Sequence, residues 1–265
     1  TYKDSDVRRV VALDKAKAES TEDALADPIK AKVFQHYMDK SEIPMGPMVD
    51  GAGNRISGIE DFLGRDQYGI DSPHPNMVVS DILEQFPALS HAGKFHAMLA
   101  ASSIPEAVNY YHLFKQQAPK LHVTALFDPN IDNNEGATDK EDALTEIITD
   151  YNEAFGKEFV IPTWPAMKKD ISSRLSHKSP YGGIATNRSQ QLDLLIVVDQ
   201  MLTGFDSKWV NTLYLDKIID YESIIQAFSR TNRLFGPDKP FGVIRYYRKP
   251  YTMHGFIEAA VKLYS

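Results

Sequence analysis

The spacing of hydrophobic and polar positions changes about a third of the way along the chain. From residue 94 onward, short apolar runs alternate with stretches whose apolar residues recur every three or four positions. The first pattern is typical of buried strands and the second of helices that pack by one face. The alternation predicts strands over residues 95–100, 121–127, 192–198, 212–215 and 242–247, and helices over 103–117, 138–155, 164–175 and 221–233.

Local signals support several of these helix ends. Ser103 and Glu106 have the spacing of a capping box, in which two side chains bond the free backbone N–H groups of a helix start. Thr138 and Glu141 have the same spacing, and the helix that they open should stop just before Gly156. Because strands alternate with helices, we expect an α/β fold with a mostly parallel sheet and helices on both faces.

The chain before this alternation has a weaker pattern. Asp27 and Pro28 suit the start of a helix that extends to about Lys40. Residues 41–78 are rich in Gly, Pro, Asp and Asn and should be irregular, and a short helix is expected over 80–86. The expected parts are therefore an N-terminal helix with a linker or wrapping segment (1–79), the α/β body (80–250) and the start of a C-terminal helical region (251–265).

Composition restricts the possible chemistry. The 265 residues are 43% hydrophobic, and no stretch approaches the roughly 18 apolar residues of a membrane span, so we expect a soluble, cytoplasmic protein. The absence of cysteine excludes thiolate zinc sites, and the eight histidines show no pairing typical of a metal site, so no bound metal is expected. A net charge of −7 argues against a surface that coats DNA unaided, although a local basic groove is compatible with it.

The eight residues that begin at Gln226 carry the most informative charges. On the predicted helix, Gln226, Arg230 and Arg233 share one face, and Ile224 and Phe228 point the opposite way. Planar guanidinium groups suit phosphate oxygens and can neutralise charge that develops on a transferring phosphoryl group. The alternative is a solvated helix face, the commoner fate of two arginines on a helix.

A second candidate site follows the predicted strand 192–198. Thr203, Gly204 and Asp206 lie in the next loop, and ligands of open α/β sheets bind beyond the carboxyl ends of strands. Glycine lets the backbone approach a ligand, and the carboxylate could accept from a ribose hydroxyl or hold the loop. The alternative is an ordinary turn with an aspartate hydrogen bond.

Together these segments resemble a known family. Residues 194–207 (LLIVVDQMLTGFDS), 211–217 (NTLYLDK) and 226–233 (QAFSRTNR) are similar, in order and spacing, to motifs V and VI of the motor subunit of type I restriction enzymes, a superfamily 2 DNA translocase. Residues 94–115 are similar to the motif IV strand and helix of that branch. The resemblance covers about residues 80–250 and implies the second RecA-like motor lobe of such a subunit.

The resemblance also implies a role for each matched residue. Arg230 and Arg233 would be arginine fingers that reach ATP on the other lobe, with Gln226 in support. Gly204 and Asp206 would couple the bound nucleotide to DNA.

Contacts with DNA are expected from three further residues. Thr203 would contact the DNA backbone or shape its loop. Ser102 and Ser103 follow a strand and precede a helix, where free N–H groups and the helix dipole favour a phosphate. Plain helix capping is the alternative for both serines.

Motifs of the first lobe and of a nuclease are absent from this sequence. Gly93 and Lys94 lack the other residues of a P-loop, and Pro237 and Asp238 lack a following Glu-x-Lys. We therefore expect the chain alone to be inactive. ATP and Mg2+ would bind mainly to a first lobe that, like the nuclease domain, would lie upstream of Thr1 in a longer parent protein.

Further partners and alternative interpretations complete the expectations. Double-stranded DNA and the methyltransferase and specificity subunits of a restriction complex are the expected partners, and no membrane is expected. The chain could instead be the equivalent lobe of another superfamily 2 DNA helicase or translocase, which a parent without a nuclease domain would indicate. A non-catalytic docking scaffold is the other alternative, and the ATP affinity of a two-lobe protein would distinguish it.

Overall fold

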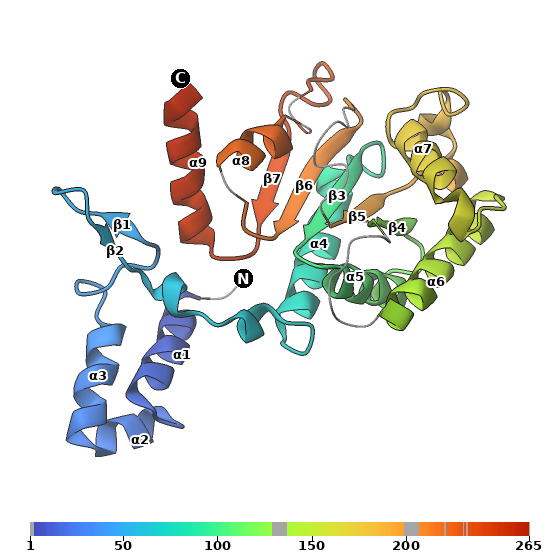
Figure 1. Ribbon diagram of the computed structural model, residues 1–265. Helices are drawn as coiled ribbons and strands as arrows, with labels where there is room; N and C mark the ends of the chain where they lie inside the picture. Colours follow the sequence, from blue (N-terminus) through green and yellow to red (C-terminus); the bar gives the residue numbers. More distant parts are fainter. Residues whose placement is uncertain are drawn as a thin grey trace. The chain divides into compact units, whose positions relative to one another are not determined.

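The chain folds into two compact units in a computed structural model that describes residues 3–128, 137–198, 207–219, 221–229, 231 and 233–264. The first unit combines the residues up to Tyr68 with those from Lys249 onward, and the second spans Gly69–Arg248. Figure 1 shows the helices of the first unit in blue and red and the sheet of the second in green and orange.

A five-stranded parallel sheet forms the centre of the second unit. Its strands lie in the order β4 (Val123–Leu126), β5 (Leu194–Val197), β3 (His96–Ala101), β6 (Val210–Asp216) and β7 (Val243–Tyr246). Every residue of β3, β5 and β6 is buried, because central strands of a parallel sheet are covered on both faces. The predicted α/β fold is confirmed, and the observed strand ends lie within two residues of the predicted ones.

Helices cover both faces of this sheet. On β7, Arg245 bonds Asp81 of α4 at 2.9 Å, whereas the preceding Ile244 lies beside Ile225 and Phe228 of α8. The arrangement is consistent with a RecA-like fold. The helices of this unit are α4 (His74–Leu89), α5 (Ile104–Gln117), α6 (Ala137–Phe155), α7 (Trp164–Leu175) and α8 (Tyr221–Phe228), with 3-10 turns η3 (Ile161–Thr163), η4 (Ile184–Thr186) and η5 (Arg188–Gln190).

Helix ends agree with the sequence at some positions and differ at others. α7 has the predicted bounds, and α6 ends before Gly156, whose φ of 63° takes the backbone out of the helix. Thr138 is not the N-cap of α6, because the helix already includes Ala137. The short helix expected over 80–86 is the longer α4, which starts at His74 and has Pro75 in its first turn, where a missing backbone N–H costs no intrahelical hydrogen bond.

The first unit is mostly helical. Asp27 caps α3 as predicted, since its carboxylate accepts from the Ile29 backbone N–H at 2.7 Å. The pattern did not predict α1 or α2, because their buried faces consist largely of alanines, which are weak hydrophobic signals. The elements of this unit are α1 (Asp4–Ala16), α2 (Thr21–Ala26), α3 (Pro28–Met38), β1 (Met48–Val49), β2 (Arg55–Ile56), η1 (Ile59–Phe62), η2 (Arg65–Tyr68) and α9 (Pro250–Tyr264).

A buried carboxylate holds α9 to the rest of this unit. Glu60 of η1 is 1% exposed and accepts from the backbone N–H groups of Tyr251 and Thr252 at 3.0 and 2.7 Å. These N–H groups belong to the first turn of α9, which has no intrahelical acceptors for them. Across the helices that the structure describes, none is long and apolar enough to cross a membrane.

Candidate functional site

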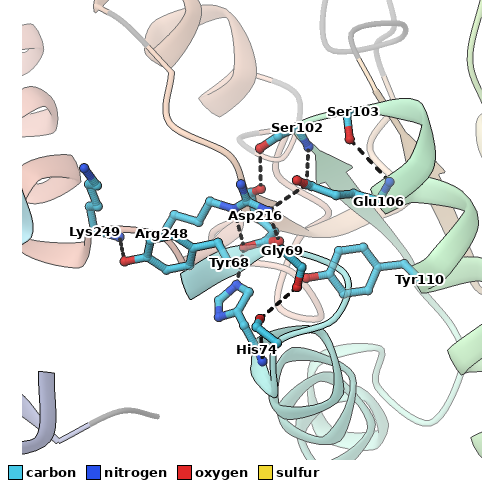
Figure 2. A network of polar contacts seen from close by, with 11 residues as sticks. Tyr68, Gly69, His74, Ser102, Ser103, Glu106, Tyr110, Asp216, Arg248 and Lys249 are labelled. Atoms are coloured by element: carbon cyan, nitrogen blue, oxygen red, sulfur yellow. Dashed lines mark hydrogen bonds and ion pairs between the residues drawn. The ribbon is translucent and has the colours of Figure 1, made fainter. Parts of the chain in front are cut away.

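The carboxyl ends of β3 and β6 lie side by side and are joined by the polar network in Figure 2. The Ser102 hydroxyl, just after β3, donates to the backbone oxygen of Asp216 at 3.0 Å. The Asp216 carboxylate is fully buried and accepts from His74 Nε2 at 2.7 Å and from the Tyr110 hydroxyl at 2.6 Å. The last residue of β6 therefore connects two helices to the end of β3.

Arg248 links this carboxylate to a second one. Its Nε and Nη2 each lie 3.0 Å from an Asp216 carboxylate oxygen, and Nη2 lies 2.6 Å from Glu106 Oε2. The same Glu106 oxygen accepts from the Ser102 backbone N–H at 3.2 Å. One guanidinium thus serves two carboxylates, and both carboxylate residues position Ser102.

The pKa values of the two carboxyls in the network are shifted in opposite directions. Burial opposes ionisation of Asp216, but hydrogen bonds from His74 and Arg248 outweigh it and hold the pKa of this carboxyl below its ordinary value. Burial raises the pKa of Glu106, and the neighbouring Asp216 adds to the rise despite Arg248. Burial, together with Asp216, also raises the pKa of Tyr110, which stays a donor. Asp216 is enclosed by its donors, so it acts in the fold and not as an accessible base.

Both predicted serines at this edge have protein partners. The Ser103 side chain accepts from the Glu106 backbone N–H at 3.3 Å, which confirms it as the N-cap of α5. In a complete capping box the Glu106 carboxylate would accept from the Ser103 backbone N–H. Here it accepts from the Ser102 N–H. Ser102 is exposed and Ser103 is half-buried, so a contact between these residues and DNA stays a prediction.

The predicted helix over 221–233 is too long. α8 ends at Phe228, where side chains of the next residues bond the carbonyls of its last turn. The Ser229 hydroxyl donates to Gln226 O at 2.7 Å, and the Thr231 hydroxyl donates to Phe228 O at 3.4 Å. Serine and threonine compete in this way with continued helix formation. Arg233 therefore follows the helix, and the prediction that it shares a helix face with Gln226 is wrong.

Other parts of that prediction have separate outcomes. Gln226 is exposed on α8 and Ile224 is fully buried, as expected for opposite faces. Phe228 is only half-buried. Arg230 lies outside the described residues, so its role stays a prediction.

The loop that carries Arg233 is held at two points. A Cβ atom on Gly242 would lie 2.3 Å from Thr231 O, so the backbones of these two residues are in close contact. Farther along, the Phe235 N–H donates to Lys239 O at 3.0 Å across a turn in which Gly236 has a φ of 58°. Arg233 lies between these points and is exposed.

This loop packs against the segment that leads into β6. The Phe235 ring centroid lies 4.6 Å from that of Trp209, and Lys239 Nζ donates to Val210 O at 2.7 Å. Val210 begins β6, so the arginine loop lies at the amino edge of the sheet. Ser102 and Ser103 lie at the opposite, carboxyl edge.

The predicted loop residues Thr203, Gly204 and Asp206 lie outside the described residues. Their described flanks are Val198, which follows the carboxyl end of β5, and Ser207, which precedes the amino end of β6. The Arg233 loop therefore lies close to the amino end of β6, on the side of Ser207. Ser102 and Ser103 lie at the carboxyl edge of the sheet, on the side of Val198.

Sequence reasoning missed four residues of these two regions: His74, Asp216, Arg248 and Lys239. A carboxylate that ends a long apolar run was an available signal for Asp216. The other three residues bond partners distant in the sequence, and no local pattern marks such pairs.

Side chains of the types that bind metal ions do not cluster in the part of the chain that the structure describes. No group of three or more histidine, aspartate or glutamate side chains with the geometry for a metal ion occurs among the described residues. Glu106 and Asp216 are already surrounded by hydrogen-bond donors.

Comparisons with known proteins point to one family. A family model described as type I restriction enzyme subunit R domain 3 matches residues 93–249. The SsaAORF53P endonuclease subunit of a type I restriction enzyme from Staphylococcus saprophyticus is 34% identical over 77% of this chain and 22% of its own length. The SauMRSORF196P subunit from Staphylococcus aureus is 34% identical over 65% of this chain and 18% of its own length.

A more distant relative extends the same match. The HindI endonuclease subunit from Haemophilus influenzae is 28% identical over 60% of this chain and 13% of its own length. The chain spans about a fifth of the length of the first two relatives. Because the family match contains all five strands of the parallel sheet, this chain belongs to the family of type I restriction enzyme R subunits, in the part represented by domain 3.

Proposed function

We propose that this chain is the second RecA-like motor lobe of an R subunit that uses ATP to move double-stranded DNA and cleaves it with a separate nuclease domain. The observation that carries the proposal is the packing of the Arg233 loop against the segment between Asp206 and β6, through Phe235 and Lys239. The Arg233 loop thus lies beside Trp209 and Val210, the described residues that follow the segment of Gly204 and Asp206 in the sequence.

The proposed reaction needs a first lobe to complete the site. ATP and Mg2+ would bind mainly to that lobe, and Arg230 and Arg233 would reach the transferring phosphoryl group from this one. Gln226 would support the arginines, and Gly204 with Asp206 would couple the nucleotide to DNA. Arg233 projects from a loop anchored on both sides, which suits a group that must be placed with precision.

Contacts with DNA would be made at the other edge of the sheet. Ser102 and Ser103 would meet backbone phosphates there, and Thr203, which lies outside the described residues, would be a further DNA contact. The Ser102 N–H and hydroxyl already bond Glu106 and Asp216 O, so Ser102 would have to exchange one of these bonds for a phosphate. The Ser103 hydroxyl accepts from the Glu106 N–H and could donate its own proton to a phosphate. The methyltransferase and specificity subunits would be the protein partners of the whole subunit.

Replacement of Arg233 in the full-length subunit tests the proposal. Arg233→Ala should lower DNA-stimulated ATP turnover by about 10³- to 10⁵-fold, the range for arginine fingers. Arg233→Lys should also fail, because an ammonium does not reproduce the planar fork. The exposed Arg233 side chain can be removed without opening a core cavity, so the melting temperature should stay within a few degrees.

Arg9→Ala provides the matched control. Arg9 is 53% exposed and forms a surface ion pair with Asp6, so its loss should change neither turnover nor melting. Normal turnover in both Arg233 variants would contradict the proposed role, and lost turnover with a collapsed melting temperature would make Arg233 a structural residue.

A further inference from the structure

Lys239 is a charged residue buried at the amino edge of the sheet. We infer that it is a positioning residue: its ammonium group anchors the loop that carries Arg233 to β6 and so determines where the arginine meets ATP. The inference rests on the proposed function, and it adds a residue to which neither the sequence motifs nor the family match assigns a role.

Burial makes the hydrogen bonds of Lys239 energetically important. The residue is 1% exposed, and its Nζ donates to Val210 O at 2.7 Å and to Lys208 O at 3.3 Å. An ammonium group that loses its water on burial is strongly destabilising unless protein acceptors replace that water. An apolar side chain would fill the same space without the need for hydrogen-bond acceptors. With lysine, the position of the loop depends on the carbonyl oxygens of Val210 and Lys208.

The stronger acceptor belongs to a rigid element. Val210 is the first residue of β6 and pairs with His96 of β3, and β7 pairs with β6 from Thr212 onward. The Val210 carbonyl therefore belongs to backbone that is paired within the sheet. Lys239 is therefore anchored to the sheet itself.

The anchor extends from Lys239 to the backbone next to Arg233. The Lys239 carbonyl accepts from the Phe235 N–H at 3.0 Å, and the Lys239 N–H donates to Gly236 O at 3.3 Å. Phe235 is two residues from Arg233, and its ring packs against Trp209 and Phe95 at centroid distances of 4.6 and 5.9 Å.

The other side of the loop is held by a different contact. Thr231 is 1% exposed and its backbone touches Gly242, directly before β7. Arg233 is thus two residues from a fixed point on either side. Loss of the Lys239 anchor should free only one of these points and leave the strands intact.

Loose placement of an arginine finger should affect the reaction step more than nucleotide binding. A displacement of about 1 Å in a reacting group can lower a rate about 100-fold. ATP itself would be held mainly by the first lobe. A positioning role therefore predicts a fall in kcat for ATP hydrolysis with little change in KM.

The test is Lys239→Met in the full-length subunit, assembled with its partner subunits and supplied with ATP and duplex DNA. We expect amide hydrogen exchange to accelerate over residues 231–239 but not in β3 or β5, and kcat to fall about 10- to 100-fold while KM stays within about 3-fold. Lys120→Met, the same substitution at an exposed lysine after α5, should change neither measurement.

A double variant separates positioning from a general structural effect. If Lys239 acts through Arg233, Lys239→Met should lower kcat no further in an Arg233→Ala background, since the contribution of Arg233 is already absent there. Additive losses would overturn the inference. Unchanged hydrogen exchange would overturn it as well, whatever the turnover.

The remaining outcomes are also decisive. Faster exchange with normal kcat in Lys239→Met, where Arg233→Ala is inactive, would reject the positioning role and leave the proposed function standing. Normal kcat in Arg233→Ala would reject both. If Lys239→Met does not fold, Phe235→Leu weakens the ring contact with Trp209 while keeping the lysine, and the same kcat and exchange pattern is expected.

Discussion

At the scale of single residues, Asp216 shows how one side chain can hold several elements together. Its carboxylate bonds His74 at the start of α4, Tyr110 within α5 and Arg248 after β7. Desolvation of a carboxylate is unfavourable, so these donors are what keep it ionised inside the protein. When the carboxylate is removed, the same donors are left without this acceptor and destabilise the folded state.

Asp216→Ala should therefore lower the free energy of unfolding by about 3–5 kcal/mol, because it leaves Arg248, whose side chain is only 12% exposed, without this partner. Asp216→Asn keeps the shape and one acceptor oxygen and should lower it less. Urea unfolding followed by tryptophan fluorescence measures both values. Asp71→Ala removes an exposed carboxylate of the same unit and should have no measurable effect, and an equally small loss in Asp216→Ala would refute the network's contribution.

At the scale of elements, the sequence predicted what local patterning controls. The run Leu194, Leu195, Ile196 and Val197 is apolar at every position and is fully buried as β5. α7 starts at Trp164, just before Pro165, and ends at Leu175, as its apolar spacing indicated. Such elements carry their own boundaries in their sequence.

Other elements depend on competition or on distant contacts. α8 stops early because Ser229 and Thr231 bond its last carbonyls, a local effect that the apolar pattern does not include. Lys239 reaches Val210, 29 residues away, so its burial follows from the tertiary fold. The candidate site was accordingly predictable as a set of segments, while the residues that hold those segments together were not.

The N-terminus of α5 allows a test of capping against DNA contact. Ser103→Ala removes the cap and should lower the free energy of unfolding by about 0.5–2 kcal/mol. Ser103→Asp keeps a good cap but places a negative charge where a phosphate is proposed to lie, so the full-length subunit should bind DNA more weakly without loss of stability.

Titration of labelled duplex DNA, beside a thermal melt, measures both effects of Ser103. Ser189→Asp adds the same charge at another exposed serine and should leave affinity unchanged. Unchanged DNA affinity in Ser103→Asp would assign Ser103 to capping alone.

At the scale of the whole molecule, the two units can be followed separately. Both tryptophans of the chain, Trp164 and Trp209, belong to the second unit, so tryptophan fluorescence reports on that unit alone. Trp209 also stacks on His177 with ring centroids 3.8 Å apart. Tryptophan fluorescence therefore reports on the surroundings of His177. We expect His177 and a neighbouring histidine to make the stability of the second unit depend on pH.

The pair consists of His96 and His177, whose Nε2 atoms lie 2.8 Å apart. His96 Nδ1–H donates to Leu192 O, so its Nε2 accepts from His177. Burial lowers the pKa of His96 to about 3, and the nearby His177, Arg188 and Arg174 add to this. Burial and Lys208 lower the pKa of His177 to about 4.

These lowered pKa values determine the direction of the pH dependence. Both histidines are neutral in the folded state, whereas the unfolded chain takes up protons once the pH falls below about 6.5. Their contribution to stability is therefore complete above pH 6.5 and is lost as the pH falls toward 4 and then 3. The lowered pKa of Asp216 adds a loss in the same direction at the acid end.

We expect the tryptophan-detected melting temperature of the 265-residue chain to fall steadily between pH 7 and pH 4.5. His177→Phe keeps an aromatic ring against Trp209 but cannot take up a proton, so its melting temperature should vary less steeply with pH even if it is lower throughout. His91→Phe, at an exposed histidine of the same unit, should keep the slope of the unchanged protein. Equal slopes in all three proteins would show that the buried pair does not control the acid sensitivity of this unit, which would then be assigned to carboxylates such as Asp216, whose protonation also opposes folding.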